Sequence, residues 1–159
     1  MNAQTQKVLD IILRDGSPEV AVEPVAPKMN YVGLWQRAVI AADAALAACT
    51  PTPMVVTAHK NPLDDNSPVA KQWYVPEGAC GFASVHVPYK GKGAEFIRAL
   101  KKAGLAGEGR GWQKHYQSGF YFWVSAGGQS IDRKEAWAQA AVDVLREAGI
   151  DAWSSSRLD

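Results

Sequence analysis

The spacing of apolar residues changes repeatedly along the second half of this chain, and these changes limit the folds it can form. Apolar residues with a period of two are typical of a half-buried strand, and spacings of three and four residues are typical of an amphipathic helix. The pattern predicts six segments in the order strand, helix, strand, strand, helix, strand: 81–87, 93–102, 111–117, 119–125, 132–149 and 150–154. We therefore expect an α+β fold.

That order is the split βαβ arrangement of ferredoxin-like folds, in which two helices cover one face of an antiparallel sheet. We accordingly predict an antiparallel sheet with a ferredoxin-like βαββαβ core at about residues 80–155. Asp132 followed by Glu135 resembles the capping box that begins a helix. The serine-rich residues 154–159 are predicted to be a frayed end.

The first half of the chain predicts helices and a linker. From Tyr31 to Cys49, apolar residues recur at helical spacing in an alanine-rich stretch, which favours a helix. A short helix is predicted at 4–14, and the three prolines at 17–28 favour an extended linker or an edge strand over a helix. We therefore expect an arm at residues 1–30 and a single α+β domain at 31–159.

Two short strands are predicted between the long helix and the core. Met54 to Thr57 and Gln72 to Val75 are rich in β-branched and aromatic residues. In a ferredoxin-like sheet the first strand, here 81–87, is already flanked on both sides. Gln72 to Val75 must therefore pair elsewhere, or the sheet has a different strand order.

The composition is that of an ordinary globular protein. The 159 residues carry a net charge of +1, which gives no overall attraction to nucleic acid or to an anionic membrane. The two cysteines, Cys49 and Cys80, do not form a disulfide framework and fit a reducing compartment. Because there is no long apolar run and no basic region followed by an apolar one at the N-terminus, we expect a cytoplasmic protein without membrane contact.

Aromatic residues are concentrated in the predicted hairpin and occupy both of its faces. Phe120 and Phe122 share one face of the second strand, whereas Tyr121 and Trp123 share the other. The 81–87 strand is expected to turn Phe82 outward as well. If one aromatic face packs on the helices, the other must be covered or used for binding.

Two kinds of occupant are expected for this second aromatic face. The Tyr31 to Cys49 helix or a second copy of the chain would bury it, because large bare aromatic faces are uncommon. Alternatively, bases of single-stranded nucleic acid would stack on it, as in RNA-recognition modules, although Ser118 and Tyr121 depart from the pattern of those modules. The residues predicted for this second function are Lys90, Lys92, Lys101, Lys102, Arg110 and Lys114, with Trp112, Tyr121 or Trp123 as stacking rings.

No catalytic, cofactor or metal motif is predicted. The glycine turns at 89–93 and 107–111 match neither a P-loop nor a dinucleotide fingerprint. A thiol enzyme that uses Cys80 is the remaining alternative, but six residues of extended strand would separate Cys80 from His86 by about 20 Å. His115 could approach Cys80 from the hairpin.

Several blocks of this sequence resemble a family of short uncharacterised proteins encoded by phages and other mobile elements. The blocks are 51–56, 80–83, 129–130 followed by 133–136, 148–150 and 156–159. The resemblance covers about residues 31–159 and implies an accessory protein without a defined activity. Our leading hypothesis is a non-enzymatic binding or interaction protein, homo-oligomeric through its N-terminal arm or its aromatic sheet face.

Overall fold

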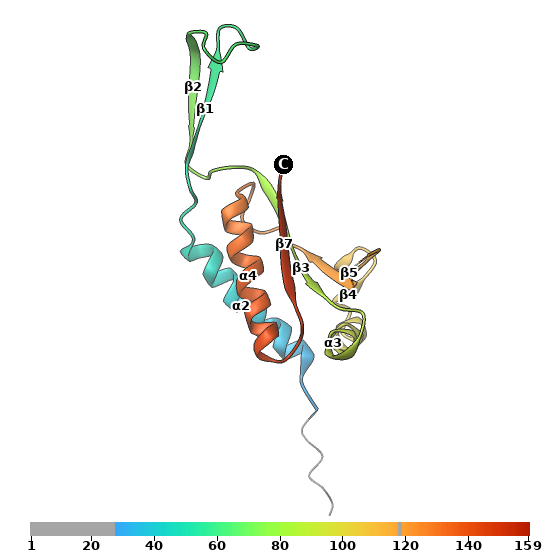
Figure 1. The fold of residues 1–159 in the computed structure, drawn as a ribbon. Coiled ribbons are helices and arrows are strands. Elements are labelled where there is room, and N and C mark those ends of the chain that lie inside the picture. The colour runs from blue at the N-terminus through green and yellow to red at the C-terminus, as the bar shows by residue number, and fades with distance from the viewer. Residues whose placement is uncertain (1–27, 118) are drawn as a thin grey trace, which may run out of the picture.

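The computed structural model describes residues 28–117 and 119–159 (Figure 1). The predicted helix at 4–14, and the linker as far as residue 27, lie outside the described residues. Within the described residues the elements are α2 (Tyr31–Ala48), β1 (Met54–His59), β2 (Val69–Val75), β3 (Gly81–Val87), α3 (Gly91–Lys102), β4 (Ala106–Gly107), β5 (Arg110–His115), β6 (Gly119–Trp123), α4 (Ile131–Glu147) and β7 (Trp153–Leu158).

Five of these strands form one antiparallel sheet. Their order is β4-β5-β6-β3-β7, and each neighbouring pair is antiparallel. The α+β class is therefore confirmed. The plain ferredoxin-like βαββαβ core is not, because the short strand β4 enters between α3 and β5 and changes the strand order by forming one edge.

The three helices of the described residues, α2, α3 and α4, lie on one face of this sheet. Helix α4 packs on β3 and β7, and α2 lies beside α4 (Figure 1). On α2, the ring of Trp35 lies 5.1 Å from that of Trp112 and 4.9 Å from that of Phe122, while Phe96 of α3 contacts both tryptophans. Because α2 packs on this face, the expectation that it covers Tyr121 and Trp123 is wrong.

Helix α4 begins earlier than predicted. Its N-cap is Ser130, which makes no side-chain capping bond, so Asp132 is not the cap of a capping box. Asp132 instead accepts a hydrogen bond from the backbone N–H of Thr52 at 2.6 Å. This contact ties the first turn of α4 to the segment that leads into β1.

The C-terminal residues form a strand, so the prediction of a frayed end is wrong. Strand β7 pairs with β3 and forms the second edge of the sheet. Although serines have little intrinsic strand preference, the free side of β3 supplies backbone partners for the whole segment. This pairing places Ser155 opposite Ser84, and Arg157 opposite Phe82.

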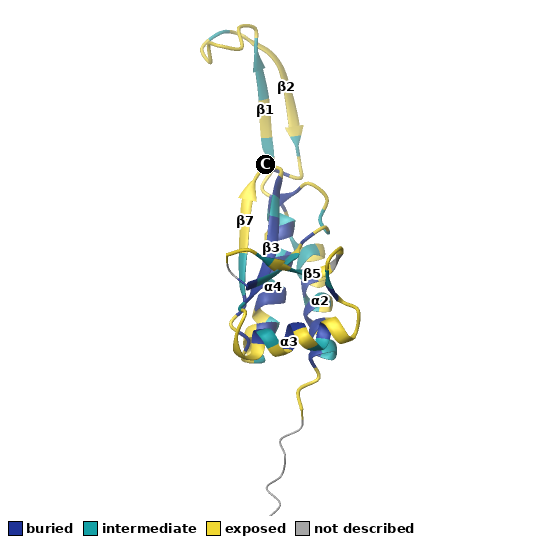
Figure 2. Ribbon diagram, turned by 90° about the vertical axis from the view of Figure 1, so that its right-hand side faces the viewer, coloured by how far each residue is buried: buried dark blue, intermediate teal, exposed yellow. Residues whose placement is uncertain are grey.

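Strands β1 and β2 form a separate two-stranded sheet that projects from the body (Figures 1 and 2). We call Met54–Val75 the β1–β2 arm. The predicted Gln72 to Val75 strand thus pairs elsewhere, with β1, in agreement with the first of the two alternatives. Both faces of the arm expose apolar side chains, because Val56 and Trp73 are cross-strand partners on one face, and Val55 and Tyr74 are partners on the other.

Among the described residues, no helix is both long enough and apolar enough to span a bilayer.

Candidate functional site

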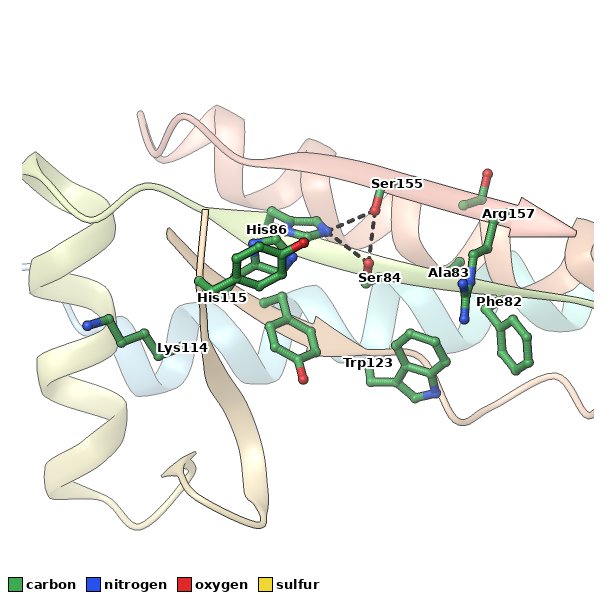
Figure 3. Close-up of a pocket in the computed structure, with 12 residues that line it drawn as sticks. Phe82, Ala83, Ser84, His86, Lys114, His115, Trp123, Ser155 and Arg157 are labelled. Atoms are coloured by element: carbon green, nitrogen blue, oxygen red, sulfur yellow. Dashed lines mark hydrogen bonds between the residues drawn. The ribbon is translucent and has the colours of Figure 1, made fainter. Parts of the chain in front are cut away.

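The face of the five-stranded sheet opposite the helices carries a group of aromatic side chains. The register pairs His86 with Tyr121, and Ser84 with Trp123, and Phe82 lies two residues before Ser84 on the same face. The rings of Phe82 and Trp123 lie 5.3 Å apart, tilted by 37°. We call this surface, defined by Phe82, His86, Tyr121 and Trp123, the ring surface (Figure 3).

Packing of the helices on the other face of the sheet explains why Tyr121 and Trp123 lie on the ring surface. Strand β6 alternates strictly, so packing Phe122 under the helices turns its neighbours Tyr121 and Trp123 to the opposite face. Phe122 stacks on Trp137 of α4, with ring centroids 5.5 Å apart. Trp123, in contrast, keeps 44% of its surface exposed. The predicted division of the aromatic residues between two faces is confirmed.

Three polar side chains form a hydrogen-bonded triangle in the middle of the ring surface. His86 Nε2 lies 2.8 Å from Ser84 Oγ and 2.9 Å from Ser155 Oγ, and the two hydroxyl oxygens are 3.0 Å apart (Figure 3). The imidazole stacks on Trp153 at 5.2 Å between centroids. The triangle fixes the orientation of His86.

His86 is nearly enclosed, with only 6% of its surface exposed. Its Nδ1 atom has no hydrogen-bond partner among the described residues. Burial lowers the pKa of His86, and the nearby imidazole of His115 lowers it further. His86 is therefore neutral at pH 7.

A hollow of about 460 Å³ lies over the ring surface. Its lining combines rings, hydroxyl groups and the cationic side chain of Arg157, and none of its lining residues is Asp or Glu. Its residues include Phe82, Ser84, His86, Tyr121, Trp123, Ser155 and Arg157. This combination suits a planar ligand that also carries polar or anionic groups.

The three aromatic residues predicted as stacking rings do not lie together in the structure. Tyr121 and Trp123 belong to the ring surface, whereas Trp112 is only 1% exposed and lies in the core. The hairpin register pairs Trp112 with Phe122, which places its indole under the helices. Trp112 is thus unavailable as a stacking ring, contrary to its inclusion in the predicted site.

The predicted basic residues are also dispersed. Lys114 lines the hollow, but its amino group lies 5.7 Å from the centre of the Tyr89 ring and points away from the other labelled side chains (Figure 3). Lys101 lies over Phe120, and Lys92 donates a hydrogen bond to the carbonyl of Ala148. The remaining predicted residues are Lys90 at the N-cap of α3, Lys102 at its last position and Arg110 at the start of β5.

Cys80 is not part of this site. Its thiol is exposed next to the start of β3, and its backbone forms an isolated antiparallel β-bridge with Ser130. It does not line the hollow, whose lining includes His86 and His115. In the part of the chain that the structure describes, no three His, Cys, Asp or Glu side chains are grouped as metal ligands would be.

Sequence reasoning missed Ser155 and Arg157. The alternation of side chains in 153–158 places both on one face, but this signal is informative only if the segment is a strand. The serine-rich composition argued against a strand, and pairing with β3 overrides that preference.

No family model, no curated protein and no solved structure matches this chain. The resemblance to proteins of phages and mobile elements therefore stays a prediction.

Proposed function

We propose that this chain is a non-enzymatic binding protein whose ring surface holds the bases of single-stranded nucleic acid. The observation that carries the proposal is the contact between Phe82 and Trp123 on neighbouring strands, on the sheet face opposite the three helices. Exposed bases present flat apolar faces, and aromatic side chains on a sheet are a recurrent platform for them.

The energetics are adequate for such a ligand. Stacking of a base on an aromatic side chain contributes roughly 1–3 kcal/mol, judged by alanine substitution, and depends little on base identity. Two such platforms on one face would give weak to moderate binding of any sequence. The hydroxyl oxygen of Ser155 is exposed in the hollow and keeps acceptor capacity beyond the triangle, so it can accept a hydrogen bond from a base edge.

A titration of the full chain with a short single-stranded oligonucleotide tests this function. The Trp123→Ala substitution should weaken binding by roughly 5- to 150-fold, which corresponds to the loss of one stacking ring. Trp73→Ala is the matched control, since Trp73 is 42% exposed, close to the 44% of Trp123, but lies on the β1–β2 arm. Absence of binding to the unmodified chain, or equal effects of the two substitutions, would refute the proposal.

A second function is favoured by the β1–β2 arm. We infer that the arm joins two copies of this chain, because a two-stranded hairpin is marginally stable alone and this one exposes apolar residues on both faces. Among the described residues, β1 and β2 form strand pairs only with each other, so both outer edges of the arm are also free to pair.

Light scattering after size exclusion tests the role of the arm. We expect a dimer for the unmodified chain, a monomer for Trp73→Lys, and a dimer for Trp123→Lys. A monomeric unmodified chain at high concentration would exclude this second function. Dissociation by Trp123→Lys alone would move the interface to the ring surface.

We also propose that the sheet is an extended variant of the split βαβ arrangement. The position of β3 between β6 and β7 supports this assignment, with β4 as an added edge strand.

A further inference from the structure

Two cations flank the ring of Phe82. The guanidinium carbon of Arg157 lies 5.2 Å from the ring centre, and the ammonium nitrogen of Lys134 lies 5.3 Å from it. Arg157 comes from β7 and Lys134 from α4, so the sheet edge and the covering helix both direct positive charge to one aromatic side chain. Cation–π attraction holds these groups near the ring.

Lys134 is an unusual residue in this position because it is only 5% exposed. Its Nζ donates one hydrogen bond, to the carbonyl oxygen of Gly81 at 2.7 Å. Among the described residues, no carboxylate forms an ion pair with it. A buried ammonium group without a counter-ion is costly, so an anion bound nearby would be stabilised by its charge.

Arg157 is the accessible member of the pair. It is exposed, lines the hollow, and its guanidinium group makes no hydrogen bond to an acceptor in the described part of the chain. Figure 3 shows its side chain extending beside Phe82, at the end of the ring surface where Trp123 also lies. Its N–H groups therefore remain available to a ligand held on the neighbouring rings.

We propose that Arg157, supported by the buried charge of Lys134, binds a backbone phosphate of the nucleotide whose base stacks on Trp123. This proposal rests on the proposed function and adds a defined anion subsite to it. A guanidinium group matches the two oxygens of a phosphate with paired N–H donors. The lysines of α3 are less suited, because Lys101 and Lys92 already contact Phe120 and Ala148.

The experiment measures the salt dependence of binding by the full chain, using an oligodeoxythymidylate of about eight residues. Each phosphate neutralised on a single strand contributes about 0.7 to the slope of log affinity against log salt concentration. Arg157→Gln should therefore weaken binding several-fold and reduce the slope by about 0.7. Arg157→Lys should keep the slope, and Trp123→Ala should weaken binding without changing it.

Arg37→Gln is the matched control, because Arg37 is an exposed arginine of α2 that does not line the hollow. It should leave both affinity and slope unchanged. Thermal unfolding of each variant separates lost binding from lost folding.

Three results would overturn the proposal. An unaltered slope in Arg157→Gln, with normal binding by the unmodified chain, would refute the anion subsite and leave the proposed function intact. An equal loss of slope in Arg37→Gln would show a general charge effect. Failure of the unmodified chain to bind the oligomer would refute both ideas. In a further outcome, an abasic oligomer binds as tightly as the thymidylate while Arg157→Gln still reduces the slope of log affinity against log salt concentration. That result would refute the stacking of a base on Trp123 and would support only the phosphate contact of Arg157.

Discussion

The indole of Trp123 contacts the ring of Phe82 across two central strands, on the sheet face opposite the helices. One residue earlier on β6, Phe122 stacks on Trp137 beneath those helices. A single strand thus supplies aromatic rings both to the core and to the exposed face. Stability and binding should therefore respond to different substitutions on the same strand.

Trp35 should be essential for stability. Its ring is buried and contacts those of Phe96, Trp112, Phe122 and Trp137, so it joins α2 to both other helices and to the sheet. Trp35→Ala should lower the free energy of unfolding by about 3–5 kcal/mol through lost contacts and a cavity. Denaturant unfolding measures this loss. A decrease below that of the exposed Trp73→Ala would contradict the packing described.

Arg133 should contribute more to stability than its ion pair suggests. It pairs with Glu77 at 2.7 Å, and its Nη1 also donates to the carbonyl oxygens of Leu46 and Cys49 at the end of α2. Glu77→Gln should change the free energy of unfolding little, because the ion pair is solvent-exposed. Arg133→Ala should lower it more, since that substitution also removes charge-assisted hydrogen bonds to two carbonyl oxygens. Equal losses in chemical unfolding would show that the carbonyl contacts contribute nothing.

Gly119 should tolerate no side chain at the start of β6. It has a φ of +110°, and an added Cβ would overlap the carbonyl oxygen of Val87. Gly91 also has a positive φ, of +59°, but no atom lies near its added Cβ. Gly91→Ala should cost about 1–2 kcal/mol for the left-handed conformation alone, and Gly119→Ala should cost more. Similar melting temperatures for the two variants would argue against the close approach.

His86 should make stability depend on pH. Its pKa in the folded chain lies below the ordinary value of 6.5, so the unfolded chain binds the proton more tightly. The contribution of His86 is therefore complete above that value and decreases as pH falls through it toward the folded pKa. The imidazole of His86 faces Tyr121 on the adjacent strand β6 and His115 on β5, the strand beyond it.

Urea unfolding between about pH 7.5 and about pH 5.5 measures this effect. The unmodified chain should lose stability toward the acid end, and His86→Asn should lose less over the same interval. His59→Asn, on the arm, is the control and should follow the unmodified chain. If the free energy of unfolding of His86→Asn changed with pH in the same way as that of the unmodified chain, protonation of His86 would not be what destabilises the folded chain.

The sequence predicts the parts of this fold that depend on local periodicity. Strict alternation in β6 assigns Phe122 and Trp123 to opposite faces, and the apolar stripe of α4 is equally clear. Local periodicity does not predict the register of the β5–β6 hairpin, because that register depends on the turn that joins the strands. That register decides that Trp112 shares a face with Phe122, which no count of aromatic residues could establish.

Tertiary pairing decides the rest. The segment 153–158 becomes a strand because β3 has a free side, and only then do Ser155 and Arg157 reach the site. The projection of the β1–β2 arm is similarly invisible in its composition, since apolar strand residues usually indicate a place in a core. Of the residues that line the hollow, Lys114, Tyr121 and Trp123 were thus named from the sequence, and Ser155 and Arg157 were not.

The indole N–H signals of the six tryptophans in a nuclear magnetic resonance titration test the central claim most directly. On addition of a single-stranded oligonucleotide, the chemical shift of the Trp123 signal should change until the binding site is saturated. The chemical shifts of the buried Trp35 and Trp112, and of Trp73 on the β1–β2 arm, should not change. An oligonucleotide that binds without moving the Trp123 signal, or moves only that of Trp73, would contradict base stacking on the ring surface.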